Sequence, residues 1–427
     1  MNNKQRPNPE LKRTLGLFDA ASISIGAIIG AGIFVVTGIV AGLAGPSVIV
    51  SIILAGIIAS FTALSFAQLS AYMPKEGGGY EFTYHLLSPF AGFISGWMWV
   101  FSNIFIGAAV SIGFAQYLSA LVPYLPVNVA AAAICLTFTV INYAGVRQSA
   151  IINDALVVAK IAILLFFIAF GLSFVQLSNF TPFMPKGVMG VFEGAALIFF
   201  AYGGYARVTT VSEEVKDPSR TIPRAIILAI IVSTVLYVLI GVISVGLVGS
   251  QRLGAAGSPL ADAISVTGNS GAVFLVSLGA MIATASVLLM TILGVSRMTF
   301  AMARNGQFPA FFSQINRRFQ TPHYAILITG ILSSILVFTD FSRLVAVGTF
   351  SLLFHHALVN LSALRLQPRN RRYPVFVSVM GFLLCIAMLV FLSLEAWTIS
   401  VAGIVLGLAL YVLMARGTKH AETQARI

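Results

Sequence analysis

The chain is 427 residues long, 58% hydrophobic and only 9% charged, which lies far outside the composition of soluble domains. Its 25 Lys and Arg and 13 Asp and Glu are too few to cover soluble cores of this size. Two cysteines and 33 phenylalanines exclude a disulfide framework and a disordered chain. Because the apolar runs are continuous rather than alternating, the sequence predicts an all-α membrane protein.

Twelve apolar segments follow one another along the chain, most of them long enough to cross about 30 Å of hydrocarbon as a helix. Turn formers such as Gly45-Pro46 and Pro74 separate them. The expected spans cover residues 15–43, 46–73, 87–122, 127–144, 150–174, 189–212, 223–248, 271–302, 323–339, 342–364, 375–394 and 397–415.

The basic residues indicate how these spans are oriented. With both termini inside, 19 of the 25 Lys and Arg fall in inner segments, 3 in outer loops and 3 within spans. This asymmetry predicts a multi-pass protein of the cell membrane with both termini cytoplasmic. The net charge of +12 is therefore a topology signal. Contacts with anionic lipid of the bilayer are expected from the basic groups, and nucleic-acid binding is not.

The first span contains a glycine-rich stretch, Gly26-Ala-Ile-Ile-Gly-Ala-Gly-Ile-Phe34, that disfavours a straight helix. One interpretation is a small-residue packing face made by Gly26 and Gly30. The other is unwound backbone at Gly30-Ala31-Gly32, which would leave N–H and C=O groups for a ligand. We expect the break, because Gly32 adds nothing to a packing face.

The sixth span carries a similar stretch, Phe199-Phe-Ala-Tyr-Gly-Gly-Tyr-Ala206. Its glycine pair is consistent with a second break or with a close helix crossing. Interrupted segments at corresponding places in two successive halves are typical of inverted-repeat transporters with a site at the midplane. Helix N-termini there would attract a carboxylate, and freed carbonyls would accept from an ammonium. An α-amino acid carries both groups.

Four motifs now resemble those of a known superfamily. They are the first-span stretch, Ala63 to Tyr80, the sixth-span run continuing to Ala225, and Ser296 to Pro309. In these motifs the chain resembles the amino acid–polyamine–organocation (APC) transporter superfamily, particularly its cationic-amino-acid-transporter-like permeases. The resemblance extends over about residues 15–415. It implies a five-plus-five inverted repeat of the LeuT-like kind with broken helices 1 and 6, two additional C-terminal helices, and amino-acid transport by alternating access.

Domain boundaries follow from this resemblance. They are a cytoplasmic tail over 1–14, a first repeat over 15–174, a second, inverted repeat over 189–364, helices 11 and 12 over 375–415 and a cytoplasmic tail over 416–427. The resemblance also implies substrate contacts. The backbone of the first break would meet the carboxylate, and the sixth span would line the amino and side-chain end, with Phe200 or Tyr202 as an aromatic lid. The residues concerned are Ile29, Gly30, Ala31, Gly32, Phe200, Ala201, Tyr202 and Gly203. Relatives more often have Ser or Thr at the position of Ala31.

Lys160 lies about 16 Å along the fifth span, close to the midplane. A charge there is costly, and burial favours the neutral amine, so the group is suited to loading and releasing a proton. The alternative is a lysine held by carbonyls or facing a water-filled vestibule. In proton-coupled relatives a lysine at this place occupies an ion position. The resemblance implies contacts with the first break and with Thr284 or Ser286 of the eighth span.

Arg207 departs from the pattern of relatives, which usually have a small or acidic residue there. We weigh snorkelling or an ion pair with Asp19 or Glu81 at an inner gate against direct contact with an anionic substrate group. Glu213 and Glu214 belong to a charged inner loop, which we interpret as a salt-bridged hinge.

The remaining polar residues predict no metal site, no nucleotide cradle and no enzyme. His355-His356 lack companions at metal spacing, and Gly77-Gly78-Gly79 lacks the phosphate-loop frame. No cofactor is expected. The leading hypothesis is a permease that carries a neutral or apolar amino acid by proton symport. The alternatives are an ion-independent amino-acid exchanger, a non-transporting membrane scaffold or transceptor, and a channel.

Overall fold

The computed structural model describes residues 13–74, 77–145, 150–316, 318–319 and 321–424. Over these ranges the chain is helical, with no β-strand and one isolated bridge between Leu15 and Val215. The prediction of an all-α protein is therefore confirmed.

The helices follow one another with short connections, as expected when each apolar run satisfies its own backbone groups. In chain order they are α1 Leu17–Ile28, η1 Gly32–Val36, α2 Thr37–Ala44, η2 Gly45–Ser47, α3 Val48–Tyr72, α4 Gly79–Leu86, α5 Pro89–Leu121, α6 Val127–Tyr143, α7 Ala150–Leu172, η3 Leu177–Phe180, α8 Gly187–Ile198, η4 Phe199–Glu214, α9 Pro218–Ala255, α10 Pro259–Ser265, α11 Ser270–Arg304, η5 Ala310–Ser313, α12 His323–Leu336, α13 Phe341–Leu364, η6 Pro368–Asn370, α14 Val375–Leu389 and α15 Leu394–Gln424.

Eight of the described segments are long and apolar enough to cross a membrane. One of them, Leu17–Tyr72, joins α1, α2 and α3, and the apolar helices α6, α12 and α14 are shorter. The protein is thus a multi-pass helical membrane protein. Twelve passes, the inverted repeat and the domain boundaries stay predictions.

Two short helices lie outside the predicted spans. These are α4, which follows the glycines at 77–79, and α10, which begins at Pro259. Each is too short and too polar at its ends to stand out as an apolar run. The longer helices α5, α11 and α13 begin and end within two residues of their predicted spans.

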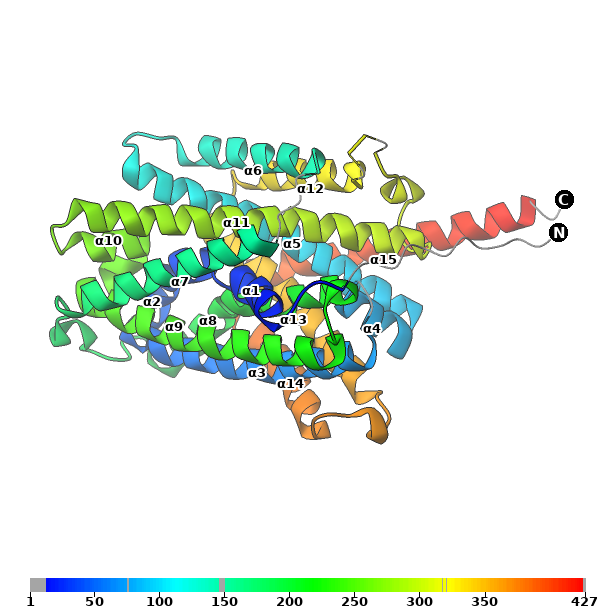
Figure 1. Ribbon diagram of the computed structural model, residues 1–427, viewed down its shortest axis with the longest axis horizontal. Coiled ribbons are helices and arrows are strands. Elements are labelled where there is room, and N and C mark those ends of the chain that lie inside the picture. The colour runs from blue at the N-terminus through cyan, green and yellow to red at the C-terminus, as the bar shows by residue number, and fades with distance from the viewer. Residues whose placement is uncertain (1–12, 75–76, 146–149, 317, 320, 425–427) are drawn as a thin grey trace.

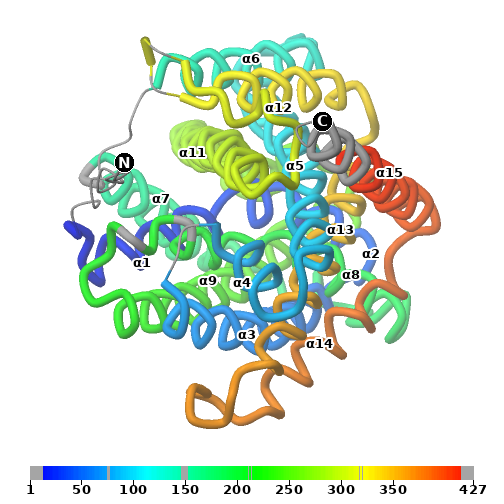
Figure 2. Tube along the Cα trace, turned by 90° about the vertical axis from the view of Figure 1, so that its right-hand side faces the viewer, coloured from blue at the N-terminus to red at the C-terminus, as the bar shows by residue number. Residues whose placement is uncertain are grey.

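The helices divide into an interior set and a rim (Figures 1 and 2). Figure 2 shows α5 and α13 inside the bundle. At its edge, α6 lies beside α12, and α14 and α15 lie at other places along the edge. The most apolar stretch of α13 is 83% buried, whereas that of α15 is 17% buried and exposes its apolar side chains. Figure 1 shows α4 and the last turns of α15 at the same end of the bundle. The interior set surrounds the interrupted segments that form the candidate site.

Candidate functional site

The first expected break is present in α1. This helix ends at Ile28, residues 29–30 are not helical, and winding resumes in a π-helix over Gly32–Val36. Ile29 has an extended backbone conformation, with φ −74° and ψ 96°. A helix end leaves its last carbonyls, and a helix start its first N–H groups, without partners inside that helix. The break therefore presents acceptors on one side and donors on the other.

Two side chains from other helices donate to the carbonyl end of α1. The Lys160 Nζ, on α7, donates to the carbonyls of Gly26 and Ile29 at 3.1 and 3.4 Å. The Tyr237 hydroxyl, on α9, lies 2.8 Å from the carbonyl of Ile28 and 3.2 Å from that of Ala201. Both side chains are fully buried. The frayed end of α1 is thus held in place by α7 and α9.

The sixth span is tightened rather than unwound. After α8 ends at Ile198, the chain continues as a 3-10 helix to Glu214, and only Val211 leaves helical geometry, with φ −121° and ψ 24°. The expectation of unwound backbone at the glycine pair therefore needs correction. Such long 3-10 runs are uncommon and have poorer hydrogen-bond geometry.

Close packing explains the glycine pair. A Cβ at Gly204 would meet the backbone of Ala27, and one at Gly203 would meet the side chain of Leu352. Gly32 approaches Ala201 in the same way. The α1 break and η4 are therefore pressed together backbone against backbone. The interpretation of the pair as a close crossing fits this geometry.

A small cavity of about 40 Å³ lies where these segments meet. One water needs roughly 10–15 Å³ of such a cavity, so an amino acid could enter only if the walls move apart. The lining residues are Ala27, Ile28, Gly30, Ala31 and Gly32 from span 1, Trp99, Asn103, Ile106 and Val110 from α5, Phe200, Ala201, Gly203, Gly204 and Arg207 from η4, Val287 and Thr291 from α11, and Leu352 from α13.

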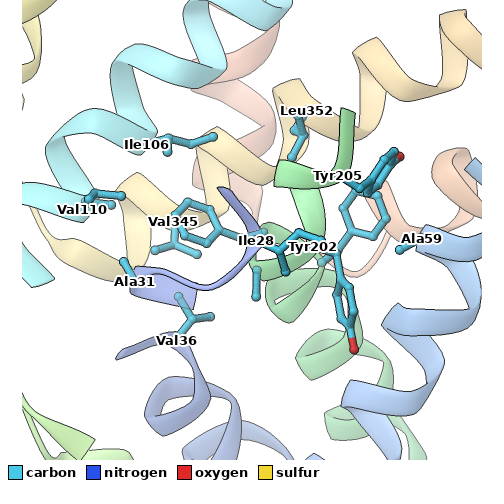
Figure 3. Packing of buried hydrophobic residues seen from close by; sticks show 14 of the residues in the cluster. Ile28, Ala31, Val36, Ala59, Ile106, Val110, Tyr202, Tyr205, Val345 and Leu352 are labelled. Carbon is cyan, nitrogen blue, oxygen red and sulfur yellow. The ribbon is translucent and has the colours of Figure 1, made fainter. Parts of the chain in front are cut away.

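The α5 wall of the cavity is aliphatic at Ile106 and Val110 and carries Trp99 and Asn103 beside them, and the opposite side is rich in backbone. Figure 3 shows Ile106 and Val110 of α5 facing the break that carries Ala31, while the hydroxyl of Tyr202 points away from them. Tyr202 is fully buried; its hydroxyl donates to the carbonyl of Ile52 at 3.3 Å and its ring packs edge-on against Tyr237.

Six of the eight residues expected at the substrate site line the cavity, namely Gly30, Ala31, Gly32, Phe200, Ala201 and Gly203. Tyr202 lies between helices, so of the two residues expected as an aromatic lid only Phe200 lines the cavity. Ile29 is buried beside the cavity, and its carbonyl accepts from Lys160.

The eighth-span residues lie on α11, which packs against α7. Thr284 is fully buried, and its hydroxyl donates within its own helix, to the carbonyls of Ala280 at 2.7 Å and Met281 at 3.1 Å. Ser286 is also buried. The hydrogen bonds of Lys160 thus go to α1 rather than to these hydroxyls.

Arg207 crosses from η4 to two interior helices. Its Nη2 donates to Asn103 Oδ1 at 2.6 Å and to Thr291 Oγ1 at 3.5 Å, and its Nη1 donates to the carbonyl of Met290 at 3.2 Å. The guanidinium also lies 5.1 Å from the centre of the Trp99 ring. This partly buried positive charge is tolerated because hydrogen bonds and the aromatic face compensate for lost water.

The two proposed ion-pair partners of Arg207 have contacts of their own. Asp19 accepts from the Gly16 N–H at 2.6 Å, and Glu81 lies 3.0 Å from the imidazole of His85. Sequence reasoning missed Tyr237, Asn103 and Trp99. Each is an ordinary polar or aromatic residue in a span, and nothing in its spacing signals a role.

The charged loop after η4 is joined to the start of the chain. The carbonyl of Glu214 accepts from the N–H groups of Thr14 and Leu15 at 3.0 and 3.1 Å, and Lys216 N–H donates to the Leu15 carbonyl at 2.8 Å. The Glu213 side chain lies outside the described residues. These hydrogen bonds join the residues just before α1 to the C-terminal end of η4.

The fold and the site together are those of a membrane transporter for small solutes, with an interrupted helix beside a buried cavity in a multi-pass bundle. The sequence pattern of the amino acid permease family matches residues 15–419, and the chain belongs to this family.

Characterised relatives extend over nearly the whole chain. The branched-chain amino acid permease BcaP of Bacillus subtilis is 33% identical, over 96% of this chain and 94% of its own. The methylthioribose transporter of Bacillus subtilis is also 33% identical, over 97% of this chain and 96% of its own. The vacuolar cationic amino acid transporter 2 of Arabidopsis thaliana is 31% identical, over 86% of this chain and 61% of its own. Similarity to relatives with such different names leaves the substrate to be inferred from the site.

Proposed function

We propose that the protein is a secondary active transporter, rather than an enzyme, that carries a neutral or apolar amino acid by proton-coupled symport and alternating access. Membership of the amino acid permease family supports transport of an amino acid. The proposal places the protein in the cell membrane with both termini cytoplasmic, and its two repeats over 15–174 and 189–364.

The cavity supports the proposed substrate class. The start of the helix at Gly32 offers N–H groups and a positive dipole end to a carboxylate. The carbonyl end of α1 borders the cavity at Ala27 and Ile28, and its negative dipole end is suited to an ammonium. Ile106, Val110 and Val287 make an aliphatic part of the wall, which the proposal assigns to the substrate side chain. A neutral, apolar side chain would lose the least solvation there.

One observation carries the proton coupling, namely the contact between Lys160 and the α1 break. A protonated amine donates strongly to the carbonyls of Gly26 and Ile29, and a neutral amine donates more weakly. Protonation would therefore stabilise the arrangement in which the break borders the cavity. Proton release would loosen it, and this couples the charge on Lys160 to the shape of the site.

Reconstituted protein tests this proposal. Purified protein is reconstituted into liposomes, and uptake of each labelled neutral amino acid is measured with and without an inward proton gradient. One set of liposomes is empty, and a second set is loaded with the same unlabelled amino acid for counterflow. We expect the gradient to drive accumulation above the external concentration. Uptake into loaded liposomes alone, at a rate independent of the gradient, would identify an ion-independent exchanger. No uptake of any amino acid would refute the proposal.

A further inference from the structure

We propose that Arg207 is the latch of an inner gate, which closes the path between the substrate cavity and a second cavity. This inference rests on the alternating access proposed above.

The second cavity lies on the side of the first that faces α4. It is lined by residues that include Gly77 and Gly79 at the start of α4, Met298 on α11, and His355 and His356 on α13. Figure 1 places α4 at the end of the bundle where α15 finishes. With the predicted topology this is the cytoplasmic end, so the second cavity is the exit vestibule.

The two cavities share three lining residues, Trp99, Gly203 and Arg207. The proposed path from one cavity to the other passes the side chains of Trp99 and Arg207 and the backbone of Gly203. The Arg207 guanidinium covers the Trp99 ring at 5.1 Å, so the two side chains form a single plug across the path.

The hydrogen bonds of Arg207 join the plug to the helices on either side. Asn103 belongs to α5, and Met290 and Thr291 belong to α11, whereas Arg207 itself belongs to η4. A planar guanidinium can direct several donors at fixed angles, which a lysine ammonium cannot do. One side chain thus holds the sixth span against both α5 and α11.

Gly294 of α11 leaves the space that the Arg207 guanidinium occupies. A Cβ at Gly294 of α11 would meet Arg207 Nη1 and would lie 3.0 Å from the Trp99 ring. Only glycine leaves this space open. Beyond Arg207, the non-helical backbone at Val211 gives η4 a point at which it can bend when the latch is released.

Thiol labelling tests the latch without any knowledge of the substrate. Val287→Cys places a thiol in the substrate cavity, on the far side of Trp99 and Arg207 from the exit vestibule, in a background where the buried Cys135 and Cys385 are changed to Ala. A membrane-impermeant maleimide is added from the α4 side. We expect Arg207→Met and Asn103→Leu to accelerate labelling about tenfold, the effect of losing one charge-assisted hydrogen bond.

Control variants distinguish loss of the Arg207 contacts from loss of a positive charge or of the fold as the cause of faster labelling. Arg297→Met removes an exposed cation from the same region of α11 and should leave the rate unchanged. Gly294→Ala retains every latch residue but displaces the guanidinium, so it should also accelerate labelling. The double variant Arg207→Met/Asn103→Leu should label no faster than Arg207→Met, because the two side chains act as a unit.

The outcomes are distinct from those of the uptake assay. Parental labelling rates in folded Arg207→Met, or equal acceleration by Arg297→Met, would overturn the latch. If Arg207→Met does not fold, parental rates in both Asn103→Leu and Gly294→Ala would overturn it. Accelerated labelling in a protein that takes up no amino acid would support the latch and refute only the proposed function.

Discussion

At the scale of single residues, the site depends on a buried amine and on glycines that permit contact between backbones. Lys160 is the deepest cation predicted from the sequence, and its hydrogen bonds go to the carbonyl end of α1. Burying an amine is favourable only when such acceptors replace water. The residue therefore contributes both to the local structure and to the proposed coupling.

Replacing this amine should uncouple transport. We expect Lys160→Ala to lower proton-gradient-driven uptake by roughly tenfold or more, as loss of charge-assisted hydrogen bonds would imply. Gradient-driven and counterflow uptake are compared in the same liposomes. Lys186→Ala, in an exposed position, serves as the matched control. Full gradient-driven uptake by Lys160→Ala would contradict the coupling role.

The glycine contact makes a separate prediction about stability. Gly204→Ala should destabilise the protein by about 1–3 kcal/mol, because a Cβ would collide with the Ala27 backbone, which cannot move without displacing α1. Thermal unfolding in detergent measures the change. The nearest atoms to a Cβ at Gly257 lie 3.8–3.9 Å away, so Gly257→Ala should change stability by less than about 0.5 kcal/mol. Equal effects of the two substitutions would contradict the argument.

At the scale of elements, the interrupted first span is held by neighbouring helices instead of by its own hydrogen bonds. The Tyr237 hydroxyl of α9 lies between the carbonyls of Ile28 and Ala201, so it bridges the end of α1 and η4. A tyrosine at this place thus sets the spacing of the two segments that form most of the cavity wall.

Removal of this hydroxyl should loosen the bridge. Tyr237→Phe is expected to lower the stability by about 1 kcal/mol and to weaken substrate binding, because buried carbonyls lose their donor. Thermal unfolding is measured with and without substrate. Tyr124 is fully exposed, so Tyr124→Phe provides the control and should have no effect. A shift no larger than that of the control would show that the bridge contributes nothing.

At the scale of the whole molecule, the distribution of basic residues makes a prediction about orientation. A thiol introduced by Arg304→Cys, at the end of α11, should react with an impermeant reagent only after the membrane is opened. One introduced by Lys186→Cys, in the loop before α8, should react in intact cells. Both positions are exposed at the ends of helices. The reverse pattern would overturn the predicted topology.

Much of the architecture could be predicted because membrane helices form locally. Each apolar run must satisfy its backbone groups within itself, so span positions follow from hydropathy alone. The ends of α5 and α13 were predicted within two residues for this reason. Gly30 and Gly32 likewise identified the first break, since low helix propensity is also a local property.

Contacts between distant segments could not be predicted in this way. Tyr202 and Phe200 are neighbours in the same motif, yet only Phe200 lines the cavity, because the tight winding of η4 turns Tyr202 toward α3. The role of Arg207 depends on Asn103, which is 104 positions away along the chain, and on the space left by Gly294.

The apolar, basic sequence therefore indicates the class of protein and predicts the positions of its spans and its orientation, since these depend on local composition and on the bilayer. The packing of the helices selects the residues that face the cavity, the side chains that cap the broken helix and the partners of Arg207. The physical reason is that the backbone hydrogen bonds of a helix form within its own segment, whereas the surroundings of its side chains depend on the helices packed against it.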